Sequence, residues 1–183
     1  MLTPDQICRY APPPNHLEGR IILISGAGDG IGREVAFACA EQGATTILLG
    51  RSVGNLESTY DAILERTAHT SVICPIDLET AGPEEYAQLN LLVNSEFGRL
   101  DGLVNNAGIL GSRTPMNHYK PQTWDSVLKI NVTAQYMLTQ ALVPTLEVSA
   151  SGASVIFTTS GVGRRSRAFW GAYAVSKFAI EGL

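Results

Sequence analysis

Short runs of consecutive apolar residues alternate with longer stretches of helical spacing along most of the chain. The runs are rich in β-branched residues and are Ile21–Ser25, Thr45–Leu49, Ser71–Ile76, Leu103–Asn105 and Ser154–Thr159. Continuous rather than alternating apolarity is typical of strands that are covered on both faces, as in a parallel sheet between helices. The pattern therefore predicts five strands of one parallel sheet.

The stretches between these runs repeat their apolar residues at the spacing of an α-helix. Three such stripes are expected to face the core: Ile31, Val35, Ala38 and Cys39; Tyr86, Leu89, Val93 and Phe97; and Trp124, Val127, Leu128, Val132 and Leu138. The last helix should be long and end close to Pro144. Strands that alternate with helices form right-handed crossovers, so we expect a doubly wound, Rossmann-type α/β fold with helices on both faces of the sheet.

The 183 residues are enough for one domain with a buried core. Residues 1–19 contain four prolines and little periodicity, and we interpret them as an N-terminal arm; residues 20–183 form the domain. The sequence stops at Leu183 inside a predicted helix, with no Gly–Pro stop and no following strand, although Gly182 could be the C-cap of that helix. We therefore expect the C-terminal part of the domain to be missing from this sequence.

Composition narrows the possible functions. Hydrophobic residues make up 45% and charged residues 16%, which excludes a disordered or coiled-coil chain. The 13 basic and 17 acidic residues give a formal charge of −4, too balanced for an electrostatic nucleic-acid binder. No apolar run is long enough to cross a bilayer, and the N-terminus does not resemble a secretory signal. Three widely spaced cysteines match no metal-binding pattern. We expect a cytoplasmic protein without nucleic-acid, membrane or metal partners.

A glycine-rich segment, Ser25–Gly32, follows the first predicted strand and opens the first helix. Glycines in this place allow a tight turn, close approach of the backbone to a phosphate and close packing of helix on sheet. The helix N-terminus offers free N–H groups and the positive end of its dipole to a pyrophosphate. The strict G-x-G-x-x-G spacing is absent, so a flexible turn without a ligand is the alternative. The candidate cofactor contacts are Gly26, Gly28, Asp29, Gly30, Ile31 and Gly32.

The end of the second strand bears on which cofactor is bound. An NAD site usually has a carboxylate there for the ribose hydroxyl, whereas this chain has Arg51 and Ser52. An arginine can pair with a 2′-phosphate through its planar fork, which favours NADP(H) and leaves NAD(H) open. Asp29 would repel a phosphate unless Arg51 engages both groups. The alternative for Arg51 is an ordinary surface arginine.

Tyr173 and Lys177 lie four residues apart on a predicted helix and so share one face. A fixed ammonium favours the phenolate form of a neighbouring tyrosine, which could then exchange a proton with a carbonyl or alcohol oxygen. Ser160 follows the fifth predicted strand, at the edge where open α/β sheets bind ligands, and could orient the reacting oxygen. No suitable histidine and no G-x-S-x-G motif support a serine hydrolase.

In this order, the elements of residues 20–183 resemble a short-chain dehydrogenase/reductase of the compact, single-domain type. The resemblance is carried by Ser25–Gly32, Asp77, Asn105–Gly108, Asn131, Ser160, Tyr173 and Lys177. Ser25 stands where threonine is commoner in the family and keeps the hydroxyl. The runs Arg20–Ile24, Asp29–Glu34 and Gly171–Ala179 are similar to a bacterial YciK-like subgroup.

The resemblance implies a role for each matching residue. Tyr173 would be the general acid/base, Lys177 would assist it and bind the nicotinamide ribose, and Ser160 would orient the substrate. Asn131, at a kinked point of its helix, would hold a water that links Lys177 to solvent. Further cofactor contacts are implied at Asp77, Leu78, Asn106, Ala107 and Gly108. The helices near residues 123–147 and 170–183 would form the bundle of a homodimer or homotetramer.

The sequence thus predicts an NADP(H)-dependent enzyme that reduces a small-molecule carbonyl or oxidises an alcohol. A catalytically silent dinucleotide-binding sensor or scaffold on the same fold is the alternative, because fold alone implies no turnover. The basic cluster Arg164–Arg167 either draws an anionic substrate or belongs to a solvated loop.

Overall fold

The computed structural model describes residues 11–67 and 69–183; residues 1–10 of the predicted arm lie outside them. The strands are β1 (Ile21–Ser25), β2 (Thr45–Gly50), β3 (Val72–Pro75), β4 (Gly102–Asn105) and β5 (Ser154–Phe157). The helices are α2 (Gly30–Glu41), α3 (Val53–Thr67), α4 (Pro83–Phe97), α5 (Pro121–Leu128), α6 (Ala134–Glu147) and α7 (Gly171–Glu181). All five predicted strands are present, with ends shifted by no more than two residues.

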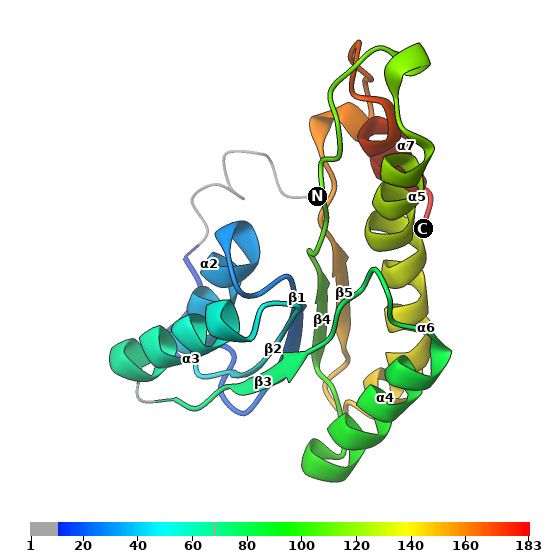
Figure 1. Cartoon of the computed structure of the whole chain (residues 1–183). Coiled ribbons are helices and arrows are strands. Elements are labelled where there is room, and N and C mark those ends of the chain that lie inside the picture. Colours follow the sequence, from blue (N-terminus) through cyan, green and yellow to red (C-terminus); the bar gives the residue numbers. More distant parts are fainter. Residues whose placement is uncertain (1–10, 68) are drawn as a thin grey trace.

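The strands form one parallel sheet in the order β3-β2-β1-β4-β5 (Figure 1). The chain winds outward from β1 to β3, then returns to the other side of β1 to add β4 and β5. The loops that follow β1 and β4 therefore leave the sheet in opposite directions, and a crevice opens between them at the carboxyl ends of the strands. The predicted doubly wound Rossmann-type fold is confirmed.

The long helix predicted near residues 123–147 consists of α5 and α6, joined without a break by the π-helical segment Lys129–Thr133. Pro144 lies inside α6, which continues to Glu147.

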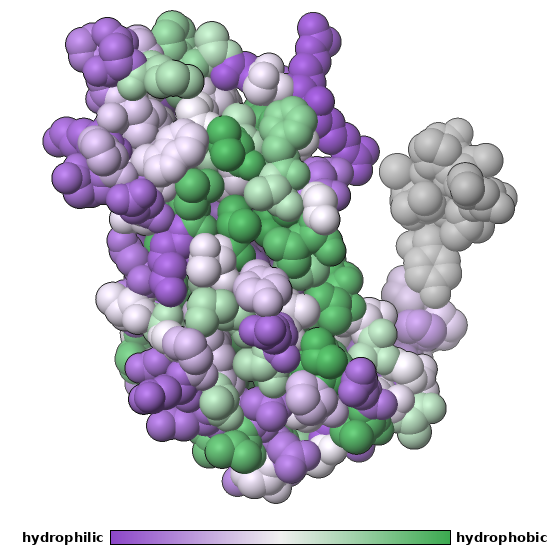
Figure 2. Space-filling model, turned by 90° about the vertical axis from the view of Figure 1, so that its right-hand side faces the viewer, coloured by the Kyte–Doolittle hydropathy of each residue, from purple (hydrophilic) through white to green (hydrophobic). Residues whose placement is uncertain are grey.

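Helices α5 and α6 lie on the same side of the molecule as α7 (Figure 1). Figure 2 shows hydrophobic residues gathered along this side. The exposed large side chains of α6 and α7 include Tyr136, Val143, Val175 and Phe178.

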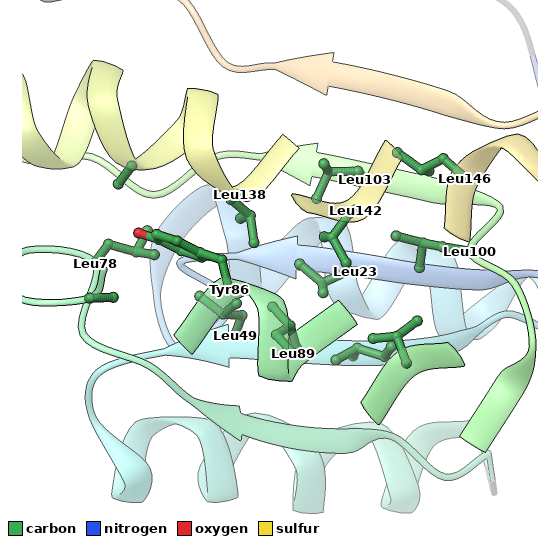
Figure 3. Close-up of a cluster of buried hydrophobic side chains, with 14 of the residues drawn as sticks. Leu23, Leu49, Leu78, Tyr86, Leu89, Leu100, Leu103, Leu138, Leu142 and Leu146 are labelled. Carbon is green, nitrogen blue, oxygen red and sulfur yellow. The ribbon is translucent and has the colours of Figure 1, made fainter. Parts of the chain in front are cut away.

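The core has two layers, one on each face of the sheet. Ile22 and Ile24 of β1 point toward α2 and α3, where they pack in a cluster with Phe37 and Leu56. Leu23 points to the opposite face, where Tyr86 of α4 and Leu138 of α6 belong to a second cluster (Figure 3). Burial of such a side chain contributes roughly 1.5–3 kcal/mol. Burial on both faces explains why β1 is a continuous apolar run.

The expectation that every strand is covered on both faces is confirmed for β1, β2 and β4. It is wrong for the two edge strands, β3 and β5. In β5, Ile156 is 55% exposed and Val155 is 41% exposed. The residues of β3 are half-buried or exposed as well. An edge strand has only one neighbour in the sheet, and its apolar composition alone does not show whether a helix covers it.

The predicted core stripe of α2 is correct only in part, because Val35 and Cys39 are partly buried against the core but the other two residues are not. Ile31 is 66% exposed and Ala38 is exposed, whereas the buried residues are Gly32, Ala36, Phe37 and Ala40. The small residues Gly32, Ala36 and Ala40 let α2 approach β1 closely, which the position of the glycine loop requires. The stripe of α4 is correct, because Tyr86, Leu89 and Val93 are buried.

Candidate active site

A cavity of about 800 Å³ lies at the carboxyl ends of the strands. Its lining comes from the segments that follow all five strands, together with the first turns of α2, α3 and α7 and the π segment. The structure brings fifteen of the predicted site residues into this lining: Gly26, Gly28, Asp29, Gly30, Ile31, Arg51, Ser52, Asp77, Leu78, Asn106, Ala107, Gly108, Ser160, Tyr173 and Lys177. Gly32 and Asn131 do not line the cavity and instead support its walls.

The glycine loop lies against the segment that follows β4. Gly26 has a φ of +68°, and a Cβ there would lie 2.9 Å from the Cα of Ala107. A Cβ on Gly32 would lie 2.2 Å from the carbonyl oxygen of Gly26. Both contacts are too short for any side chain, so glycine is required for the two loops to meet. The resulting floor of the cavity is made of backbone.

Ser25 joins the same two segments by hydrogen bonds. Its side chain is fully buried, and Oγ accepts from the backbone N–H groups of Asn106 and Ala107 at 3.0 Å each. The hydroxyl donates to the carbonyl oxygen of Val104 at 3.3 Å. Asn106 returns a bond from Nδ2 to the carbonyl of Ser25 at 3.2 Å. The hydroxyl group of Ser25 therefore makes the hydrogen bonds that join the two segments, and its methylene group makes none of them.

Asp29 has a local role that the sequence analysis missed. It is the N-cap of α2, and its Oδ1 accepts a hydrogen bond from the backbone N–H of Gly30 at 2.7 Å. Aspartate is among the preferred N-cap residues, and its charge suits the positive end of the helix dipole. The ion pairs of the described residues do not include one between Asp29 and Arg51. Joint engagement of a phosphate by these two residues therefore stays a prediction.

One end of the cavity is formed by the turn after β2 and the first turn of α3. Arg51 is exposed there and takes part in none of the ion pairs of the described residues. Asn55 and Leu56 line the cavity beside it, and a Cβ on Gly28 would lie 2.9 Å from the Cβ of Asn55. This end presents a cation and an amide with no nearby carboxylate on β2.

The other end contains Ser160, Tyr173 and Lys177. The Lys177 Nζ lies 5.6 Å from the centroid of the Tyr173 ring and donates a hydrogen bond to the carbonyl of Thr158 at 2.6 Å. Burial disfavours its charge and lowers the pKa of Lys177 below the usual value. The Ser160 Oγ accepts from the backbone N–H of Val162 at 3.4 Å, which leaves the hydroxyl proton available for another acceptor.

Asn131 braces the loop that follows β4. It is buried in the π segment, where Oδ1 accepts from the N–H of Ile109 at 2.8 Å. Its Nδ2 donates to the carbonyl of Ile109 at 2.9 Å and to the Oγ of Ser176 at 3.0 Å. The side chain thus ties the loop to α7, next to Lys177. The implied water between Asn131 and Lys177 stays a prediction.

Sequence reasoning missed nine lining residues: Gly50, Asn55, Leu56, Ile76, Ile109, Leu110, Ile130, Thr158 and Trp170. Two of them carried a usable signal. Asn55 lies four residues after Arg51, and Trp170 precedes Tyr173 by three, which is the spacing of neighbours on one helix face. The Trp170 and Tyr173 ring centroids are 5.8 Å apart. Most of the others are apolar or backbone walls that only tertiary structure identifies.

The lining fits a nicotinamide dinucleotide. Backbone without side chains, at the N-terminus of α2, suits a pyrophosphate. Arg51 at one end suits a phosphate on the adenosine ribose, and Lys177 at the other end suits a ribose hydroxyl.

Comparison with known proteins places the whole described domain in one family. The family model for short chain dehydrogenases matches residues 20–183. The oxidoreductase YciK of Escherichia coli (strain K12) is 48% identical over 174 residues, which cover 95% of this chain and 69% of YciK. Levodione reductase of Leifsonia aquatica is 30% identical over 174 residues, covering 93% of this chain and 63% of that protein. The chain thus spans about two thirds of the length of these relatives.

Solved structures agree in fold. A short-chain dehydrogenase of Shigella flexneri 2a in complex with NADP has a TM-score of 0.90 and 48% identity, over 93% of this chain and 71% of that one. A short-chain dehydrogenase of Escherichia coli CFT073 in complex with NADPH has a TM-score of 0.90 and 47% identity, with the same coverage of 93% and 71%. The similarity to the YciK-like subgroup is therefore confirmed in sequence and in structure.

Proposed function

The chain belongs to the short-chain dehydrogenase family of oxidoreductases, and on that basis we propose that it uses NADP(H) to interconvert a small-molecule carbonyl and the corresponding alcohol. The observation that carries the proposal is the shared cavity. Ser160, Tyr173 and Lys177 line the same space as the glycine loop. The proposed acid/base group and the proposed cofactor site therefore share one cavity.

In this proposal, Tyr173 is the general acid/base. Its phenol donates a proton to the carbonyl oxygen during reduction and takes one from the alcohol during oxidation. The chemistry that a nicotinamide supplies when bound is hydride transfer to or from the carbonyl carbon. The Ser160 hydroxyl, whose oxygen accepts from Val162 N–H, donates to the same substrate oxygen and fixes its position.

Lys177 is proposed to keep a positive charge beside the phenol. Its Nζ is anchored by the carbonyl of Thr158 and lies 5.6 Å from the centroid of the Tyr173 ring. A cation at this place stabilises negative charge that develops at the reacting oxygens during the proton transfer. Asn131 positions the π segment and α7 through its bonds to Ile109 and Ser176. The water that it is implied to hold would return a proton from solvent.

Ketone-dependent oxidation of NADPH tests the proposal, with Tyr173→Phe as the variant. The expected result is turnover by the unmodified chain and a loss of at least about 100-fold in the variant. NADPH binding, measured by fluorescence titration, should persist in Tyr173→Phe, because the glycine loop and Arg51 are unchanged. Equal rates for both proteins would refute the role of Tyr173. Tight NADPH binding without turnover of any ketone would favour the sensor or scaffold.

Preference for NADP(H) is proposed from the end of the cavity near α3. Arg51 is exposed, and β2 ends without a carboxylate that would select NAD(H). Two relatives of nearly half-identical sequence were solved with NADP and NADPH. Replacing Arg51 by aspartate should weaken NADPH binding and strengthen NADH binding. Unchanged affinities for both cofactors in fluorescence titrations would rule out Arg51 as the selecting residue.

We also propose that the chain self-associates as a homodimer or homotetramer through α5–α6 and α7. The exposed Tyr136, Val143, Val175 and Phe178 on these helices support the proposal. Size-exclusion chromatography with light scattering should give an oligomer, and Phe178→Glu should shift it toward the monomer.

No helix in the described part of the chain is long and apolar enough to span a membrane. A cytoplasmic location remains our proposal.

A further inference from the structure

Two segments of the chain are basic, although Asp125 and Glu181 directly follow them. Residues 106–124 and 158–180 contain six of the 13 lysines and arginines and no aspartate or glutamate: Arg113, Lys120, Arg164, Arg165, Arg167 and Lys177. All 17 acidic residues lie in the rest of the chain, which is therefore strongly negative. The cavity has Asp29 and Asp77 in its lining, from the segments after β1 and β3, but the segments after β4 and β5 and α7 contribute Lys177 and no acidic residue. A local excess of one sign of charge raises the concentration of ligands of opposite sign.

The two basic segments are joined beside the catalytic end of the cavity. The backbone N–H of Thr114 donates to the carbonyl of Phe169 at 3.2 Å. The ring of Tyr119 packs on Gly171, where a Cβ would lie 3.0 Å from Cε2. Arg113 is thus held next to the segment that leads into Tyr173.

Arg113 has a specific position relative to the proposed reaction. Its guanidinium carbon lies 5.7 Å from the centroid of the Trp170 ring. Trp170 lines the cavity, and its ring centroid is 5.8 Å from that of Tyr173. Arg113 is not itself among the lining residues, so Trp170 is the cavity residue that its guanidinium adjoins, beside Tyr173.

The contacts of Arg113 leave its charge available. A guanidinium near an aromatic ring is oriented by the ring and still has N–H donors for an anion. Arg113 is exposed and takes part in none of the ion pairs of the described residues. Arg164 differs, because its Nε is 3.1 Å from a carboxylate oxygen of Glu181.

We propose that the substrate carries a carboxylate or a phosphate, which Arg113 binds while the carbonyl group lies at Ser160 and Tyr173. Arg165 and Arg167, both exposed, add long-range attraction. The inference rests on the proposed reductase function and deepens it. A planar, ring-oriented fork suits the two oxygens of a carboxylate or phosphate better than a neutral group. We therefore expect the protein to prefer keto acids over the corresponding esters as substrates.

Matched pairs of probes test the inference. Levulinate and longer straight-chain keto acids are compared with their methyl esters, and dihydroxyacetone phosphate with dihydroxyacetone. The variant is Arg113→Met, and the control is Arg66→Met. Arg66 also lies over an aromatic ring, 4.2 Å from the centroid of Phe37, but it is at the far end of α3 from the cavity. Both variants remove one charge and one cation–aromatic contact.

The expected result is that kcat/KM for the anionic probes falls by about 10- to 100-fold in Arg113→Met and is unchanged in Arg66→Met. The neutral partners should be nearly unaffected by either change. Arg113→Lys, which keeps the charge but not the fork, should lose less than Arg113→Met. The preference of the unmodified protein for anions should also weaken as salt is added.

Equal losses for acids and esters in Arg113→Met would overturn the inference, since a merely structural stack affects both. So would the absence of any anionic probe that is preferred over its neutral partner. Isothermal titration of the same pairs in the presence of NADP⁺ gives a readout independent of turnover. If no ketone is reduced, the proposed function fails. Anion binding that depends on Arg113 would then still support the anion site, and its absence would overturn it.

Discussion

Replacing Ser25 by alanine removes the group that joins the two loops of the cofactor cavity. The Oγ accepts from the N–H groups of Asn106 and Ala107, and it is fully buried. After the change, the Asn106 N–H keeps its bond to the Val104 carbonyl at 3.1 Å. No other hydrogen bond is seen for the Ala107 N–H within the described residues.

The structure sets the size of the effect. A buried donor left without a partner costs about 1–3 kcal/mol, and the Ala107 N–H is only partly buried. We therefore expect the free energy of unfolding to fall by about 1–2 kcal/mol. Because the freed Ala107 segment packs against Gly26, NADPH affinity should fall several-fold as well.

Urea denaturation and NADPH fluorescence titration measure both effects. Ser25→Thr keeps the hydroxyl and should stay close to the unmodified protein. Ser58→Ala, on the exposed side of α3, is the matched control and should change stability by less than about 0.5 kcal/mol. A Ser25→Ala protein as stable as the Ser58→Ala control would show that the hydroxyl does not hold the loops together.

Three further predictions concern the glycine loop, a buried carboxylate and the buried lysine. Gly32→Ala puts a Cβ 2.2 Å from the carbonyl oxygen of Gly26, so NADPH affinity should fall more than about tenfold. Gly54 on α3 has open space around it, so the control Gly54→Ala should leave the NADPH affinity measured by titration unchanged. Burial opposes ionisation of Asp101, but hydrogen bonds from Ser149 and the Ile21 N–H and the charge of Arg99 outweigh it and hold its pKa below the usual value. The stability that Asp101 contributes is therefore present above about pH 4 and is lost as the pH falls through the lowered pKa. Unfolding free energies measured against pH should show this loss. The Asp101→Asn variant should not show this pH dependence. Burial lowers the pKa of Lys177, so the buried charge works against the folded state at neutral pH. Lys177→Met should therefore abolish turnover with no loss of unfolding free energy. Marked destabilisation of this variant in urea would contradict this account.

The arrangement of the elements followed closely from the sequence. Apolar runs identified all five strands, and the glycine loop, Tyr173 and Lys177 were found by spacing. The errors have a common cause: periodicity shows that a residue is apolar but not what covers it. Ile31 was therefore assigned to the core although it is exposed, and the edge strand β5 was expected to be covered although Ile156 is largely accessible.

The sequence by itself determined the parallel α/β sheet and fifteen of the residues that meet at its carboxyl edge, because strand runs and loop motifs are local patterns. Tertiary structure decided how those residues act together. Only in the folded chain does Ser25 bond the segment after β4, Asn131 tie that loop to α7, and the Arg113 guanidinium lie near the Trp170 ring. These contacts join positions far apart in the chain, and their geometry depends on packing that no single-sequence pattern encodes.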